Sequence, residues 1–544
     1  MDGQTAGSPP DGPRDGRPDR GGPVPPGPNP PVFGVPATAM RRFGATVLDP
    51  STAERSGEDR PRPRPVAYVP DRLFVPGLPG GSFEDSRSLL ERIGREMGFS
   101  VRVVDGGFGA VAEQLEVFDR LDAVAHTPVD LVPDTTAARP AIDAWTVIAR
   151  ARAEAGEDAV RGWSLNHVLM SAGGYWGGVG GYWGGVGGYW GGVGGYWGGV
   201  GGYWGGVGGY WGGVNAPGTA VGRGPLVLAL DAPAPTATHH PCVAVLDTGL
   251  GAHPWFDGSP LVTPDPTVAG QPVGLEFPPD EDPENTGVTI DRLNGMLDPM
   301  AGHGTFVSGV VRQHSPDAHL VAVPVMYGDG AADERDVLEA LKRLAAWHLA
   351  ERGAKRRGVE VVNLSLGYYH EDVDPDVTSA AVLSLLHALA ADGVAVVAAA
   401  GNGATTEEFW PAALSRHTAD GAVPVTSVGA LDHCGTDVAT FSNTGPWVTD
   451  YRRGMAVVST MPTTLDGSVN AAVHSRPPHD PARDSGDPER YACGFGVWSG
   501  TSFAAPAAAG LVAAALADVD LPHEGPERAK VVAEVVAKAL GGRP

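Results

Sequence analysis

The sequence is poor in cysteine and has no long apolar run. Its 544 residues contain three cysteines, at positions 242, 434 and 493, and this spacing fits neither a zinc site nor a dense disulfide framework. We expect reduced, buried thiols, with one disulfide and one leftover thiol as the alternative if the chain is exported. Cys493 lacks a local partner that would lower a thiol pKa, so it is not expected to be catalytic. Because no apolar run reaches about 18 residues, no membrane-spanning helix is expected.

Positive charge is also scarce. The 39 basic residues, only four of them lysine, stand against 64 acidic ones and give a formal net charge of −25. This charge argues against nucleic acid or an anionic membrane as a partner and favours solubility. The N-terminus lacks the basic start and apolar core of a secretory signal. We therefore expect a cytoplasmic protein, with secretion by another route or a misassigned start as the alternative.

Composition divides the first half of the chain into three parts. Residues 1–64 are rich in proline and glycine and carry too little apolar surface to offset the entropy of ordering, so they are predicted to be disordered. Residues 65–170 show apolar residues at strand and helix spacing, which predicts a small α/β region. Strands are expected near 66–69, 73–75, 101–104 and 129–132, and helices near 86–97, 111–121 and 141–156.

The third part, residues 171–236, is a linker dominated by a heptapeptide repeat. The unit GYWGGVG recurs with tyrosines at 175, 182, 189, 196, 203 and 210. Glycine at most positions weakens both helix and strand, and the repeat has no coiled-coil spacing. A flexible tether is expected, and a glycine-rich coil of this length would span on the order of 35 Å. A self-associating aromatic segment is the alternative.

From residue 237 to 541, apolar strands alternate with helices. This alternation predicts an α/β fold in which helices cover both faces of a mostly parallel sheet. Active groups in such folds lie at the carboxyl ends of the strands. The expected strands are 240–247, 319–325, 359–366, 393–400 and 423–429, and the expected helices are 304–312, 332–353 and 378–392.

Three polar residues at the ends of these elements follow the order acid, base, nucleophile. Asp247 ends a strand in VLDTG, His303 opens a helix in GHGT, and Ser502 opens an apolar helix in GTSFAAP. Taken singly, each has an ordinary explanation: a turn-capping aspartate, a surface or core histidine, and a helix-capping serine. Asn402, in a GNG turn after a buried strand, is either a turn residue or an amide that binds an oxyanion together with the Ser502 N–H.

Together these motifs resemble the subtilisin-like serine peptidases, the subtilase family, over residues 237–541. NLSLG at 363–367, TSVGA at 426–430 and FSNTG at 441–445 resemble further family segments. The resemblance implies a subtilisin-like three-layer fold with a mostly parallel sheet. It also implies a serine endopeptidase that hydrolyses peptide bonds of proteins or peptides through an acyl-enzyme.

The resemblance also implies a role for each residue. Ser502 attacks the carbonyl, His303 transfers the proton, and Asp247 fixes the histidine tautomer. Asn402 donates to the oxyanion, and Ser365, Leu366 and Gly367 pair with the substrate backbone as with an added strand.

Some parts of the chain depart from the family pattern. Residues 257–300 and 462–490 form long insertions, expected to be surface loops near the cleft. Relatives that bind calcium draw attention to Glu281, Asp282 and Glu284, but their spacing fits no defined calcium loop, so no metal ligand and no certain cofactor is assigned. Residues 65–135 resemble in outline the pro-domains of the family, which predicts intramolecular inhibition by the N-terminal region.

Two functions of other classes remain open at this point. One is a protease fold used only as a binding module, which loss of any triad residue would have favoured. The other is an assembly protein in which the aromatic repeat is the functional part.

Overall fold

The computed structural model of the protein describes residues 34–54, 62–104, 106–134, 142–172, 223–228, 230–372, 380–470, 474–484 and 486–541. Its C-terminal part is built on a seven-stranded sheet in the order β17-β16-β15-β13-β7-β11-β8, and every pairing in it is parallel. The strands are β7 (Cys242–Asp247), β8 (Val262–Thr263), β11 (His319–Pro324), β13 (Val361–Leu364), β15 (Ala395–Ala399), β16 (Thr426–Leu431) and β17 (Asp450–Arg453). The predicted mostly parallel sheet is therefore confirmed.

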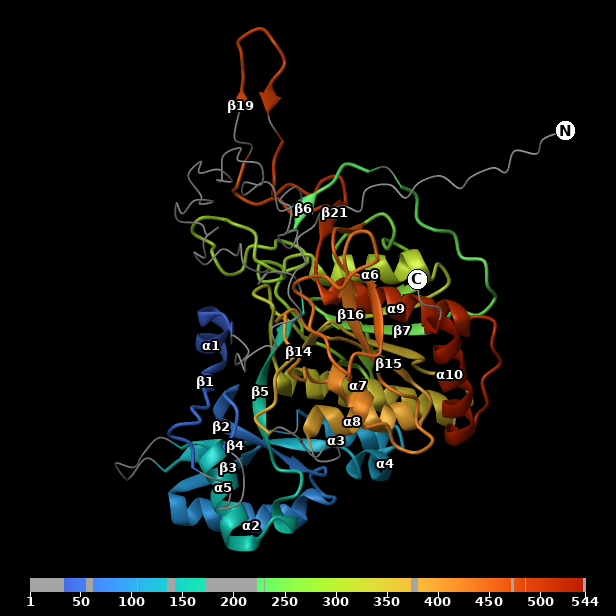
Figure 1. Cartoon of the computed structure of the whole chain (residues 1–544). Helices are drawn as coiled ribbons and strands as arrows, with labels where there is room; N and C mark the ends of the chain where they lie inside the picture. Colours follow the sequence, from blue (N-terminus) through green and yellow to red (C-terminus); the bar gives the residue numbers. More distant parts are fainter. Residues whose placement is uncertain are drawn as a thin grey trace, which may run out of the picture.

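Helices cover both faces of this sheet, which gives three layers (Figure 1). Helices α6 (His303–His314) and α9 (Thr501–Leu516) pack together on one face, and α7 (Glu334–Gly353) and α8 (Ala381–Ala391) pack together on the other. Helix α10 (Gly525–Leu540) contacts both α9 and α8 at the C-terminal end of the chain. Strands such as β15 are buried along their whole length, as the runs of valine and alanine require in a sheet covered on both sides.

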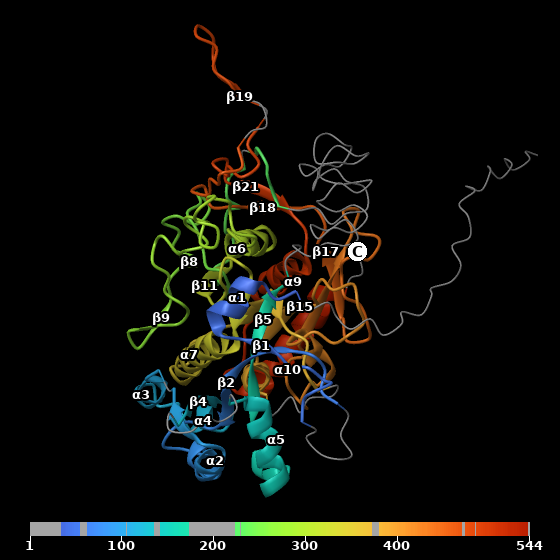
Figure 2. The same cartoon turned by 90° about the vertical axis from the view of Figure 1, so that its left-hand side faces the viewer.

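The N-terminal part forms a second, antiparallel sheet with its own helices (Figure 2). Its strand order is β12-β5-β2-β4-β3, with β1 paired to β2 and β14 paired to β5. The strands are β1 (Thr46–Val47), β2 (Ala67–Pro76), β3 (Phe99–Val103), β4 (His126–Pro133), β5 (Ser164–Ser171), β12 (Ala331–Asp333) and β14 (Leu366–Gly367). The helices are α1 (Ala37–Phe43), α2 (Phe83–Met97), α3 (Phe108–Gln114), α4 (Phe118–Asp122) and α5 (Ala144–Ala155), with a 3-10 turn at Asp158–Val160.

Several N-terminal predictions differ from the structure in a definite way. The two short strands expected at 66–69 and 73–75 are one strand, β2, with an irregular register between Val69 and Leu73. The helix expected at 111–121 is two helices, because Glu116 takes a positive φ of 57° between α3 and α4. Strand β5 has no counterpart among the predicted elements.

The predicted segment boundaries also need correction. Residues 34–54, expected to be disordered, contain α1 and β1, and Arg42 of α1 forms an ion pair of 2.9 Å with Asp329. In the predicted linker 171–236, Ser171 ends β5, and Gly224–Pro225 form β6. Residues 1–33 and 55–61 and the repeat at 174–213 lie outside the described residues, so those predictions stay predictions.

Smaller elements surround the main sheet. Strand β21 (Phe495–Trp498) lies between β18 (Val457–Thr460) and β6 in a three-stranded sheet. A short hairpin, β19 (His474–Ser475) with β20 (Arg483–Asp484), projects from the insertion at 462–490, at the top of Figure 1. The other insertion carries the pair β9 (Thr267–Val268) and β10 (Gln271–Pro272), and a 3-10 turn spans Ala412–Arg416.

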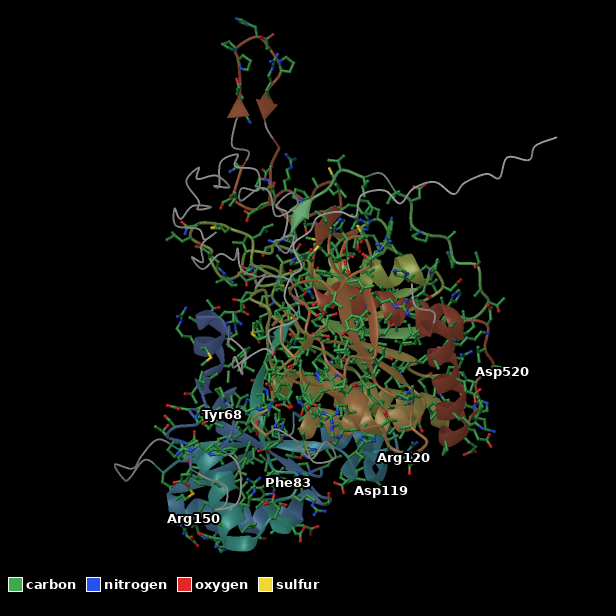
Figure 3. The ribbon with its side chains drawn as sticks, in the orientation of Figure 1. Tyr68, Phe83, Asp119, Arg120, Arg150 and Asp520 are labelled. Carbon is green, nitrogen blue, oxygen red and sulfur yellow. The ribbon has the colours of Figure 1, made fainter. Side chains whose placement is uncertain are left out.

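The N-terminal part packs against helices α7 and α8 of the C-terminal part. Leu121 and Val124 line a common hollow with Ala345, Leu349 and Leu385. Arg120 of α4 lies at this boundary, 3.3 Å from an Asp392 carboxylate oxygen (Figure 3). The two parts therefore share one hydrophobic core cluster. Among the described residues, no helix combines the length and apolar character needed to cross a membrane.

Candidate active site

The end of β7 and the start of α6 bring the predicted acid and base together. His303 Nδ1 lies 2.7 Å from Asp247 Oδ1, and both side chains are fully buried. Asp247 Oδ1 also accepts from the Thr248 N–H at 2.8 Å, while Oδ2 has no hydrogen-bond partner among the described residues. The carboxylate can therefore hold the histidine with a proton on Nδ1, which leaves Nε2 to act as the base.

The glycines around His303 are required by close contacts. A Cβ on Gly304 would lie 2.2 Å from the Gly249 carbonyl oxygen, so only glycine lets α6 begin this close to the turn after β7. Gly302 has a φ of +79°, and a Cβ there would meet Met461 at 2.7 Å. The GHGT motif thus fixes how near the base can come to the acid.

Ser502 lies in the first turn of α9, directly after Thr501. It is fully buried, and its hydroxyl donates to the Ser365 carbonyl oxygen at 3.1 Å. Among the described residues no hydrogen bond joins Ser502 Oγ to His303. Instead, Nε2 of His303 lies 3.3 Å from the hydroxyl of Ser171, the last residue of β5. The structure thus gathers the three predicted residues at one site, but the Ser502 hydroxyl is hydrogen-bonded to Ser365 and not to His303.

Two hydrogen-bond donors converge on one carbonyl at the start of α9. The Ala172 carbonyl oxygen accepts from the Ser502 N–H at 3.1 Å and from the Asn402 side-chain amide. The orientation of that amide is fixed, because Asn402 Oδ1 accepts from the Thr501 N–H at 2.9 Å and from its hydroxyl at 3.0 Å. The first turn of a helix also favours negative charge. The pair is therefore arranged to stabilise an oxyanion at this position.

Strand β5 lies in the site as an added strand between two short strands. On one side Ser171 and Met170 pair with Leu366 and Gly367 of β14. On the other side Met170, Leu169 and Val168 pair with β12. The Ala172 N–H donates to the Ser365 carbonyl at 2.9 Å, which places the end of this segment beside Ser502. The predicted strand-binding residues Ser365, Leu366 and Gly367 thus pair with the chain's own N-terminal region.

A buried ion cluster fastens β5 further from the site. Nδ1 of His167 lies 2.6 Å from a Glu334 oxygen, and Nε2 lies 2.8 Å from a Glu371 oxygen. The ring also stacks on Tyr368, with 4.4 Å between the ring centres. Burial alone would lower the pKa of His167, but the Glu371 and Glu334 carboxylates outweigh it and raise this pKa to about 10. His167 is therefore an imidazolium ion at neutral pH.

Glu284 joins the segments that carry the acid and the base. It belongs to the insertion at 257–300 and is buried, and its carboxylate contacts Thr248, Gly304 and Thr305. Both of its oxygens are therefore occupied by protein donors. Its neighbour Glu281 instead pairs with Arg292 at 3.1 Å. The insertion, expected to be a surface loop, thus places Glu284 beside the site, and others of its side chains, such as Val273 and Asp298, are buried as well.

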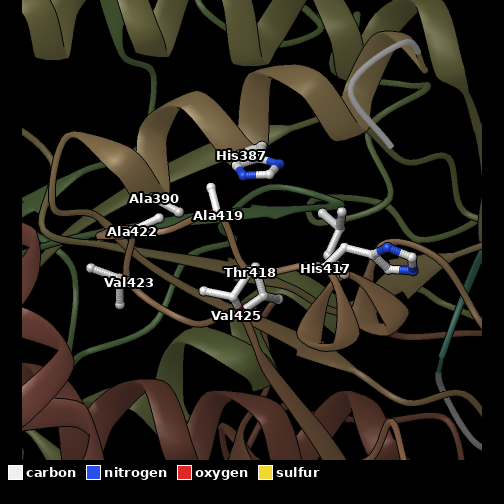
Figure 4. A pocket seen from close by; sticks show the side chains of 9 residues that line it. His387, Ala390, His417, Thr418, Ala419, Ala422, Val423 and Val425 are labelled. Atoms are coloured by element: carbon white, nitrogen blue, oxygen red, sulfur yellow. The ribbon is translucent and has the colours of Figure 1, made fainter. Parts of the chain in front are cut away.

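A separate hollow lies between α8 and the segment before β16. Figure 4 shows it lined by apolar side chains and by the rings of His387 and His417. None of its lining residues is among the predicted site residues. The predicted residues Asp247, Ser365 and Asn402 instead lie at or just after the carboxyl ends of β7, β13 and β15.

Sequence reasoning missed β5 and Ala172, and it considered Glu284 only as a calcium ligand, not as a neighbour of the acid and the base. The segment LNHVLM at 165–170 combines apolar residues with Asn166 and His167 and resembles an ordinary core strand, and nothing in it indicates a neighbour more than 100 residues away. Glu284 stands among several other acidic residues, and only the fold distinguishes it from them.

Comparison with known proteins points to one family. A family model described as the subtilase family matches residues 238–539, more than half of the chain. Subtilisin BL of Lederbergia lenta is 29% identical over 244 residues, which are 43% of this chain and 71% of the relative. The thermophilic serine proteinase of Bacillus sp. (strain AK1) is 28% identical over 273 residues, 50% of this chain and 51% of that relative, so the match spans about half of the relative's length. A solved structure of a cold adapted subtilisin-like serine proteinase is 19% identical, with a TM-score of 0.32 over 57% of this chain and 87% of that one.

Proposed function

The chain belongs to the subtilase family, and from this premise we propose that it is a serine endopeptidase with Ser502 as nucleophile, His303 as general base and Asp247 as the residue that orients the base. The observation that carries the proposal is the pair of donors, Asn402 and the Ser502 N–H, on a single carbonyl beside the Ser502 side chain. A helix-capping serine or a turn asparagine would not need this arrangement.

The reaction follows from these positions. Ser502 Oγ attacks the bound carbonyl carbon while His303 Nε2 takes the hydroxyl proton. The oxygen of the tetrahedral intermediate accepts from Asn402 and the Ser502 N–H. The C–N bond then breaks as His303 returns the proton to the leaving amine, and water hydrolyses the acyl ester by the same route. Asp247 stabilises the imidazolium in both halves of the reaction.

We further propose that the N-terminal region inhibits the enzyme in the same molecule and that the first bond cleaved lies between residues 172 and 173. Two observations support this: β5 is paired along both edges of the cleft, and the Ala172 carbonyl is bound by both oxyanion donors. Hydrolysis there leaves a carboxylate on Ala172 and a new amino group on Gly173. Until β5 leaves, no other peptide can take its place.

The test has two readouts. A fluorophosphonate probe should label the matured wild-type chain at Ser502 and should not label Ser502→Ala, while Ser308→Ala, which removes a buried hydroxyl from α6, should still label. Mass spectrometry of the matured chain should find Gly173 at the new N-terminus. Labelling that survives Ser502→Ala would remove Ser502 from its proposed role, and a different N-terminus would refute the proposed bond.

A further inference from the structure

The buried carboxylate of Glu284 is held by groups that directly follow the acid and the base in the sequence. Oε1 accepts from the Thr248 hydroxyl and, at 2.9 Å, from the Gly304 N–H. Oε2 accepts from the Thr305 hydroxyl at 2.6 Å. Thr248 follows Asp247, and Gly304 and Thr305 follow His303. One side chain thus ties the end of β7 to the start of α6.

The hydrogen bonds of the two threonines bear on whether the Glu284 carboxyl is ionised or protonated in this arrangement. The Thr248 hydroxyl accepts from the Gly304 N–H at 2.7 Å, and the Thr305 hydroxyl accepts from the Gly251 N–H at 2.7 Å. The Thr305 hydroxyl proton is therefore free to be donated to Glu284, and the Thr248 proton can go either to Glu284 or to Asp247 Oδ1, which lies 3.3 Å away. With donors at both oxygens, the ionised carboxylate fits this arrangement. A proton on Oε2 would face the Thr305 donor, and a proton on Oε1 would require the Thr248 hydroxyl to turn its own proton toward Asp247.

We propose that Glu284 is a positioning residue of the proteolytic site, whose ionised carboxylate holds β7 and α6 at the separation that lets Asp247 orient His303. This inference rests on the proposed function. Glu284 contacts Thr248, Gly304 and Thr305 rather than β5, so it acts through the acid and the base and not on the substrate. The 2.7 Å contact between Asp247 and His303 spans the same junction that Glu284 closes.

The surroundings of Glu284 make its ionisation sensitive to pH. Burial raises its pKa to about 8, the two threonine hydroxyls oppose this, and the charges of Asp282 and Asp247 add to it. The charged groups that act on it are Asp282 from its own loop and Asp247 from β7. The N-terminus of α6 favours the anion, since the Gly304 N–H in its first turn donates to Glu284. Activity is therefore expected to rise as the pH passes through about 8.

The experiment compares kcat and KM over pH for the matured wild-type chain and Glu284→Gln on a peptide substrate. The neutral amide has nearly the same size but cannot accept on both sides. We expect kcat to fall by up to about 100-fold at high pH, as small misplacements of reacting groups can cause, with KM nearly unchanged. The part of the rise of kcat that Glu284 causes near pH 8 should disappear in Glu284→Gln, while any rise that comes from deprotonation of the base His303 should remain in both proteins.

Two further variants keep the test decisive if Glu284→Gln does not fold. Thr305→Val removes one donor to the anion but keeps the shape of the side chain, so the rise of kcat should move to higher pH. Asp298→Asn changes a buried carboxylate of the same insertion, which accepts instead from Thr289 and Ile290, so the rise near pH 8 should stay. If kcat depends on pH in the same way in Glu284→Gln as in wild type, or if Thr305→Val leaves the wild-type pH dependence unchanged, the inference is overturned while the proposed function stands.

Thermal stability supplies a second measurement, which should fall with pH where activity rises. The folded pKa of Glu284, about 8, lies above its ordinary value of 4.5, so folding binds a proton. The stability from this group is present below pH 4.5 and is lost as the pH rises through 8. The melting temperature of wild type should therefore fall with pH over this range more steeply than that of Glu284→Gln. If the melting temperature changes with pH equally in both proteins, the inference is contradicted. If the wild-type chain hydrolyses no peptide at all, the proposed function is refuted, and this inference with it.

Discussion

Both nitrogens of the His303 ring have partners while β5 is in the cleft. Asp247 lies at Nδ1, and the Ser171 hydroxyl lies 3.3 Å from Nε2, where the nucleophile must bind for reaction. Ser502 meanwhile donates to the Ser365 carbonyl. The first cleavage therefore requires Ser502 Oγ to turn toward His303 and the Ser171 hydroxyl to give way.

Replacing Ser171 with alanine tests this competition. Without the hydroxyl, Nε2 is open to Ser502, and loss of one hydrogen bond of about 1 kcal/mol should speed cleavage after Ala172 about fivefold. A time course of the full chain on a denaturing gel measures the rate. Ser164→Ala, at the other end of β5, is the matched control and should process at the wild-type rate. Unchanged or slower cleavage by Ser171→Ala would show that its hydroxyl does not restrain the base.

At the scale of elements, β5 is the strand on which the proposed inhibition depends. His167, midway along β5, holds the strand through the ion cluster, and the Ala172 carbonyl just after the strand accepts from Asn402 and the Ser502 N–H. The cluster is buried, so its charges are poorly screened, and removing one partner would leave a buried charge without compensation. The strength with which β5 binds is thus tied to the protonation of a single ring.

The sign of this dependence can be worked out. The pKa of His167 is about 10 in the docked strand against an ordinary value of 6.5, so docking binds a proton. Docking should be strongest below about pH 6.5 and should weaken as the pH rises through 10. Size-exclusion chromatography of the cleaved protein at pH 6, 8 and 10 should show progressive loss of the N-terminal fragment. His167→Gln should bind it more weakly at every pH and with a smaller change. Tighter binding at pH 10 than at pH 6 would contradict the account.

The elements that could be predicted from sequence are those whose signal is local. Strands such as β7 and β15 are apolar runs ended by glycine turns, and α6 and α9 begin at motifs rich in small residues. What could not be predicted depends on distant partners. Strand β5 occupies the site because it pairs with β12 and β14, which are distant in the sequence. Helix α1 is ordered through contacts such as the one between Arg42 and Asp329. Glu284 is distinguished from other acidic residues only by the junction that it closes.

At the scale of the whole molecule, the two parts share an interior rather than merely touching. Side chains of α4 meet α7 and α8 in one hollow, and the core cluster runs from Phe74 and Phe108 into the main sheet. Each buried leucine or phenylalanine contributes about 1.5–3 kcal/mol. Cutting the chain after Ala172 removes none of these contacts.

Cleavage and release should therefore be separate events. After the bond between residues 172 and 173 is cut, the N-terminal fragment should co-elute with the rest of the protein at neutral pH, and the mixture should hydrolyse added peptides slowly. Changing Leu121 to Asp, which puts a charge into the shared hollow, should speed release without changing the N-terminus at Gly173. Separate elution of the wild-type pieces immediately after cleavage would contradict this expectation.

Because β5 is part of the same polypeptide as the cleft it occupies, the proposed inhibition would be present in every molecule from the start. Dilution cannot lower the local amount of β5 before the first cut. The delay before a molecule becomes active should therefore be the same at every concentration of the protein.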